Sequence, residues 1–137
     1  EFIAQYEAKE KENLHLFSVQ QTIPMMTFFK PVQGVVVVPY SKVQPGIEIS
    51  APKQTNISSV LAGTVVFSTY EINNTYTLVL QHDEYMTIYK NVGKVLLPVG
   101  TRVEAGATVA MTSSELPLYF ELWHHGNPIN PEEVITF

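Results

Sequence analysis

The chain has 137 residues, of which 45% are hydrophobic and 15% charged, a composition that suits one folded domain and excludes wholesale disorder. The formal net charge is −5, and the 8 Lys and Arg residues are scattered, which argues against nucleic-acid and anionic-lipid partners because both require clustered basic residues. The sequence contains no cysteine and no apolar run long enough to span a membrane, which excludes disulfides, thiolate metal sites, cysteine nucleophiles and a transmembrane segment.

The first 27 residues are predicted to form a helix and its connector. No Gly or Pro interrupts residues 1–17, and Phe2, Ile3 and Tyr6 fall on one side of the expected helix. We expect this helix to pack loosely on the rest of the chain or to mediate self-association. Because the first residue is not Met, we also expect a signal or membrane anchor to precede it in the natural protein.

Residues 28–137 are predicted to form an all-β domain, because short β-branched and aromatic runs alternate there with Gly, Pro and Asn. Asn73 and Asn74 are typical of a hairpin tip, since Asn tolerates positive φ. Gly100 and Gly106, each followed three residues later by a valine, indicate the tight turns of a barrel-sandwich hybrid fold. The predicted strands are Val35–Val38, Ile47–Ser50, Gly63–Tyr70, Tyr76–Gln81, Met86–Tyr89, Lys94–Leu97, Thr108–Met111 and Leu118–Trp123.

Seven short segments of this domain are informative because of their order. They are Phe29–Gly34, Gln44–Ser50, Val60–Val66, Leu80–Asn91, Val99–Val109, Leu116–Trp123 and Asn127–Pro131. In this order they resemble the motifs of the lysostaphin/LytM-type zinc metallopeptidases, which cut peptidoglycan, and most of all the membrane-anchored members from Bacteroidetes. The resemblance implies a LytM-like β-sandwich and a location in the periplasm or cell envelope.

The resemblance also implies where the chemistry of the family would lie. Family members hold Zn²⁺ with the His and Asp of H-x-G-x-D and the second His of H-x-H, and two further histidines assist proton transfer. The corresponding positions here are Gln44, Glu48, Asn91, Pro117 and Tyr119. Only Glu48 retains a strong ligand type. We therefore predict no catalytic residue, no bound zinc, and a hydrogen-bonded polar cluster in which Gln44, Asn91 and Tyr119 surround Glu48.

The histidines and one tyrosine are further candidates for function. His82 and Tyr89 are expected to line the groove or, for His82, to make a structural hydrogen bond beside it. His124 and His125 are adjacent, and because neighbours on a strand face opposite sides, they cannot both bind one metal ion if the strand continues through them. We expect them instead to lie at the end of the strand and in its turn, exposed to solvent, with incidental binding of a transition metal as the less favoured alternative. His15 is expected to be exposed on the N-terminal helix.

Three functions remain open on the sequence alone. The first is a non-catalytic pseudopeptidase whose groove binds a partner protein or a peptidoglycan peptide. The alternative is a residual zinc metallopeptidase, acting on peptidoglycan cross-bridges with an unusual ligand set. A lipoyl or biotinyl carrier is the third, and it requires a modifiable lysine in a D-K-A or M-K-M setting, which Lys42, Lys53, Lys90 and Lys94 lack.

Overall fold

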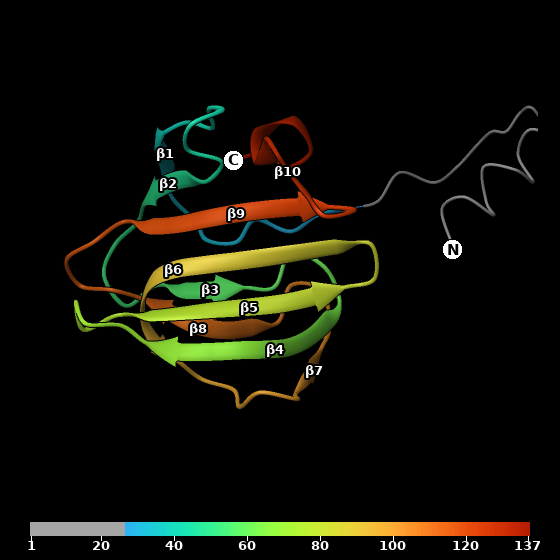
Figure 1. Ribbon diagram of the computed structural model, residues 1–137. Coiled ribbons are helices and arrows are strands. Elements are labelled where there is room, and N and C mark those ends of the chain that lie inside the picture. Colours follow the sequence, from blue (N-terminus) through green and yellow to red (C-terminus); the bar gives the residue numbers. More distant parts are fainter. Residues whose placement is uncertain (1–26) are drawn as a thin grey trace, which may run out of the picture.

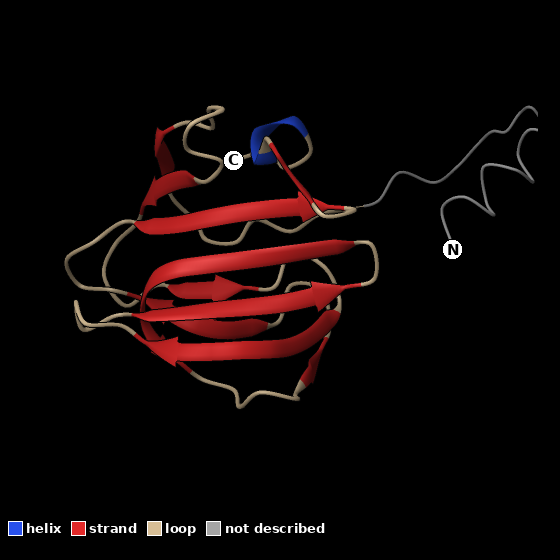
Figure 2. Ribbon diagram, in the orientation of Figure 1, coloured by secondary structure: helices blue, strands red, loops and turns tan. Residues whose placement is uncertain are grey.

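The computed structural model describes residues 27–137, so the predicted N-terminal helix lies outside the described part. Almost every regular element is a strand, as Figure 2 shows. The strands are β1 (Val35–Val38), β2 (Ile47–Ser50), β3 (Asn56–Ser58), β4 (Gly63–Tyr70), β5 (Tyr76–His82), β6 (Tyr85–Val95), β7 (Arg102–Val103), β8 (Thr108–Thr112), β9 (Leu118–His124) and β10 (Asn127–Ile129), followed by the 3₁₀ turn η1 (Pro131–Glu133).

The strands form two layers. In Figure 1, β9, β6, β5 and β4 lie side by side, and β3 and β8 lie behind them. Strand β6 joins the layers, because its residues 85–90 pair with β9 and its residues 92–95 pair with β8. Between these two stretches Asn91 has a φ of 62°, and the register with β8 shifts between Val92 and Lys94. A bulge of this kind bends a strand, and here it lets one strand serve both layers of the predicted β-sandwich.

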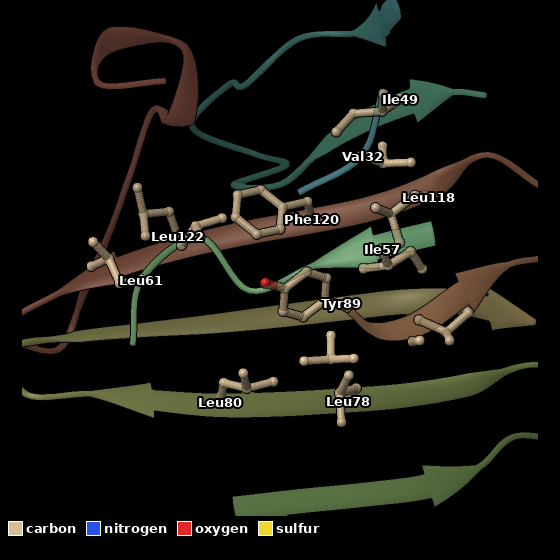
Figure 3. Close-up of a cluster of buried hydrophobic side chains, with 14 of the residues drawn as sticks. Val32, Ile49, Ile57, Leu61, Leu78, Leu80, Tyr89, Leu118, Phe120 and Leu122 are labelled. Atoms are coloured by element: carbon tan, nitrogen blue, oxygen red, sulfur yellow. The ribbon is translucent and has the colours of Figure 1, made fainter. Parts of the chain in front are cut away.

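The hydrophobic core fills the space between the layers. Figure 3 shows Leu118, Phe120 and Leu122 of β9 on the same side as Tyr89 of β6, and all four are at most 1% exposed. Side chains alternate along a strand, so the residues between them face the other way. We call this other side of β2, β9 and β6 the outer face.

Most predicted strands are confirmed, three with the predicted bounds: β1, β2 and β4. The runs Met86–Tyr89 and Lys94–Leu97 were predicted as separate strands but belong largely to β6, because the bulge bends the strand without ending it. The predicted hairpin tip is confirmed by the φ of 64° at Asn74. Within residues 27–137, no helix has the length and hydropathy needed to cross a bilayer.

Candidate functional site

Five sequence-predicted site residues come from separate segments that meet at one end of β9. Tyr119 lies opposite Glu48 of β2, and on its other side it lies opposite Lys90 of β6. The next residue along β6, Asn91, donates from its Nδ2 to the Pro117 carbonyl oxygen at 3.3 Å. The strand pairing therefore gathers these residues, and we call Gln44, Glu48, Asn91, Pro117 and Tyr119 the Tyr119 site.

Gln44 reaches this site through the loop that precedes β2. The ring of Tyr119 lies so close to Gly46 that a Cβ atom there would overlap ring carbons and the hydroxyl oxygen. The amide Nε2 of Gln44 lies 3.5 Å from the Gly46 carbonyl oxygen, so the side chain folds back on its own loop. The loop thus packs on the tyrosine ring, and this packing requires that residue 46 has no side chain.

The hydroxyl of Tyr119 is hydrogen-bonded to a residue on its own strand. It donates to Oε2 of Glu121 at 2.6 Å, and the indole Nε1 of Trp123 donates to the other carboxylate oxygen at 2.7 Å. Glu121 is 8% exposed although it belongs to the outer face. Burial, followed by the hydrogen bond and the negative charge of Glu121, raises the pKa of Tyr119 to about 12. Tyr119 is therefore a neutral hydrogen-bond donor at physiological pH.

The hydrogen-bond partners differ from the predicted cluster around Glu48. In residues 27–137, none of Gln44, Asn91 and Tyr119 donates a hydrogen bond to the Glu48 side chain, because each donates elsewhere. The carboxylate that holds Tyr119 is Glu121, which the sequence reasoning missed. Its signal was present, since a residue two positions after Tyr119 on a strand must face the same side.

The expectation that Tyr89 lines the groove is wrong, whereas the structural hydrogen bond expected of His82 is confirmed. Tyr89 is fully buried, and its hydroxyl donates to the Ser58 carbonyl oxygen at 3.0 Å. His82 is 3% exposed, with Nδ1 3.0 Å from the Ala62 carbonyl oxygen and Nε2 2.9 Å from the Thr87 hydroxyl. Both side chains point into the core because the alternation along β5 and β6 turns them away from the outer face.

Other outer-face residues surround Tyr119. The ammonium nitrogen of Lys90 lies 5.8 Å from the centroid of the Tyr119 ring, within the range of a cation–π contact. Ile88 of β6 lies opposite Glu121, and Met86 lies opposite Trp123. This part of the outer face therefore combines an exposed cation, two carboxylates, two aromatic rings and partly exposed apolar side chains. Among the described residues, no group of three or more His, Asp or Glu side chains is arranged to hold a metal ion.

The seven motifs and this geometry agree with a comparison against known families. The sequence pattern of peptidase family M23 matches residues 42–131, more than half of the chain. The chain belongs to peptidase family M23. This confirms the resemblance to lysostaphin/LytM-type peptidases. A relative of this M23 chain in Escherichia coli K12 is the uncharacterized lipoprotein YgeR, which is 32% identical over 110 residues. The match covers 74% of this chain but 44% of YgeR, so the chain spans less than half of that relative.

Solved structures share the fold. The orthorhombic crystal structure of Helicobacter pylori Csd3 has a TM-score of 0.74 at 21% identity, covering 82% of this chain and 36% of Csd3. The structure of the SpoIIQ–SpoIIIAH pore-forming complex has a TM-score of 0.67 at 18% identity, covering 82% of this chain and 92% of the matched one. At such identities the similarity concerns the fold alone, and it confirms the predicted M23-type β-sandwich.

Proposed function

We propose that this M23 domain is a non-catalytic pseudopeptidase of the cell envelope, and that its outer face at the Tyr119 site binds a partner protein or a peptidoglycan peptide. The observation that carries the proposal is the state of Tyr119. The motif resemblance assigns it to the position of a metal-binding histidine, and in the structure its ring packs on Gly46 and its hydroxyl donates to Glu121.

The residues of the Tyr119 site do not fit a zinc ion. Zinc in proteins is bound by Cys, His, Asp and Glu side chains, whereas a neutral tyrosine, two amides and a proline stand beside Glu48. The high pKa of Tyr119 opposes the phenolate form that a metal would require. Pro117 has no group that can transfer a proton, and the Asn91 amide is engaged with the Pro117 carbonyl oxygen. We therefore derive no hydrolytic step at this site.

The same face has the composition of a binding surface. Tyr and Trp are enriched in protein interfaces because their large rings add contact area while a polar atom keeps a partner, and here Glu121 fixes both Tyr119 and Trp123. Lys90 adds an exposed positive charge next to them. The E. coli relative is named as a lipoprotein, which supports a location in the cell envelope. One of the similar structures is the SpoIIQ–SpoIIIAH complex, which supports a protein partner.

Co-sedimentation with purified peptidoglycan, together with affinity capture from an envelope extract, tests this proposal. The informative variant is Lys90→Glu, because it reverses a charge beside Tyr119 without touching the core. Lys94→Glu is the matched control, since Lys94 is also exposed on β6 but lies beyond the bulge, opposite Met111. We expect Lys90→Glu alone to reduce the bound fraction. Equal binding by both variants and the wild-type protein would refute the proposed surface.

Zinc content separates the proposal from its alternative, a residual metallopeptidase. The purified wild-type protein is expected to contain no stoichiometric zinc. The triple variant Gln44→His, Glu48→Asp and Tyr119→His places the family's ligand types in the same positions and is expected to gain zinc. Stoichiometric zinc in the wild-type protein that is lost in Glu48→Ala would favour the metallopeptidase instead.

A further inference from the structure

The turn between β9 and β10 brings two histidines together. His124 is the last residue of β9 and pairs with Asn127 of β10, so His125 and Gly126 form a two-residue hairpin loop. Their φ angles are 52° and 79°, and positive φ at both central positions is the requirement of a type I′ turn. Because the strand ends at His124, the rule that neighbours face opposite sides no longer applies to His125.

The two imidazole rings lie side by side as a result. Their centroids are 4.3 Å apart, with an angle of 58° between the planes. The expectation that the two histidines lie at the end of the strand and in its turn is confirmed, so the alternation of side chains along a strand does not keep them from sharing a metal ion. At this separation one nitrogen of each ring can face a single ion at the usual metal–nitrogen distance of about 2.0–2.1 Å.

The surroundings hold one ring and leave the other free to adjust. The His124 ring stacks on Tyr85 with centroids 4.3 Å apart and an interplanar angle of 18°. The Tyr85 ring in turn meets Phe28 edge-on at 5.3 Å. His125 is exposed, and its backbone N–H donates to the Glu84 carbonyl oxygen at 3.0 Å.

We propose that His124 and His125 form a surface site for a divalent transition-metal ion of the Cu²⁺, Ni²⁺ and Zn²⁺ group. Imidazole is a ligand common to these three ions, and affinity among them generally peaks at Cu²⁺. The protein supplies two nitrogen ligands, and water or a small anion fills the other positions. Two ligands fall short of the three that a catalytic zinc site provides, so the site binds a metal without hydrolytic chemistry.

The site is separate from the Tyr119 site and does not rest on the proposed function. Five residue steps along β9 separate Tyr119 from His124, which is roughly 17 Å at the rise of an antiparallel strand. The two side chains also start from opposite faces of the strand, since odd and even positions of β9 alternate. Failure of one proposal therefore leaves the other untouched.

The chain contains its own reporter for this site. Trp123 is the only tryptophan of the chain and directly precedes His124, so a paramagnetic Cu²⁺ ion bound there quenches its fluorescence. The experiment is a Cu²⁺ titration of the full, untagged chain, followed by Trp123 emission. We expect saturable quenching, and recovery of emission when excess Zn²⁺, which has a filled d shell, displaces Cu²⁺.

Three variants locate the ligands. His125→Asn keeps a residue that tolerates positive φ, and His124→Gln keeps a polar side chain of similar length. Each is expected to weaken Cu²⁺ binding by at least about tenfold. Replacing a residue that only supports a metal ligand already lowers metal affinity by about tenfold or more, so loss of a ligand should have at least this effect. His15→Gln is the matched control and should bind as the wild-type protein does. Wild-type affinity in His125→Asn, loss of quenching in His15→Gln, or quenching that never saturates would overturn the proposal.

Discussion

Replacing Gly46 by alanine tests the packing at the Tyr119 site most sharply. The backbone of Gly46 lies outside the positive-φ region, so alanine adds no backbone strain there. The nearest atoms to the new Cβ all belong to the end of the Tyr119 side chain, which must move away. Its hydrogen bond to Glu121 is then lost, and hydrogen bonds to charged groups contribute about 1.5–3 kcal/mol. We expect Gly46→Ala to lower the free energy of unfolding by that amount.

A double-mutant cycle with Tyr119→Ala isolates this effect. In the Tyr119→Ala background the Cβ enters vacated space, and Gly→Ala at an unstrained position stabilises a protein by roughly 0.4–1 kcal/mol through the unfolded chain. Urea unfolding followed by Trp123 emission measures all four proteins, and Trp123 is well placed because its indole donates to the same Glu121. The two effects differ by a coupling energy of about 2–4 kcal/mol, at or above the upper part of the range for residues in contact. Equal effects of Gly46→Ala in both backgrounds would refute the packing argument.

Two further predictions concern the core. Tyr89→Phe leaves the Ser58 carbonyl oxygen without its buried donor, so it should lower the free energy of unfolding, measured in urea, by about 1–3 kcal/mol. The control is Tyr70→Phe, which removes an exposed hydroxyl and should change the free energy of unfolding by no more than about 0.5 kcal/mol. Burial is the main cause that lowers the pKa of His82 below its ordinary 6.5, so the unfolded chain binds a proton that the folded chain excludes. The free energy of unfolding is then retained above about pH 6.5 and falls as the pH drops below it. His82→Gln should make the free energy of unfolding less dependent on pH in this range. An unchanged dependence would contradict the role given to His82.

The fold was largely predictable because local patterns and long-range packing agree. The β-branched and aromatic runs predicted the bounds of β1, β2 and β4, and the turn glycines marked the connections. The strands β3, β7 and β10 have two or three residues each, which is too short for a period-two pattern to be recognised in the sequence. Strand β6 was predicted as two strands because Asn91 and Gly93 are typical of a turn. In the structure β6 pairs with both β9 and β8, and this pairing keeps Asn91 and Gly93 inside one bent strand.

The site was predictable only as a set of positions. Aligning motifs identified Gln44, Glu48 and Tyr119, but it could not say which acceptor the Tyr119 hydroxyl would find. That choice depends on distances across β9, where Glu121 lies on the same face and Glu48 lies on the neighbouring strand. The error at Tyr89 has a similar origin. The inward direction of its side chain follows from its place in the alternation along β6, which a motif does not reveal.

The absence of catalysis is the central claim, and a cell-wall digestion assay tests it most directly. Purified peptidoglycan is incubated with the wild-type protein at saturating Zn²⁺ or with a chelator, and released peptides are quantified beside a catalytic M23 peptidase as positive control. We predict no metal-dependent release by the wild-type protein, because Tyr119 is a neutral donor engaged with Glu121. Peptide release that requires the metal, stops with the chelator and disappears in Glu48→Ala would contradict the account.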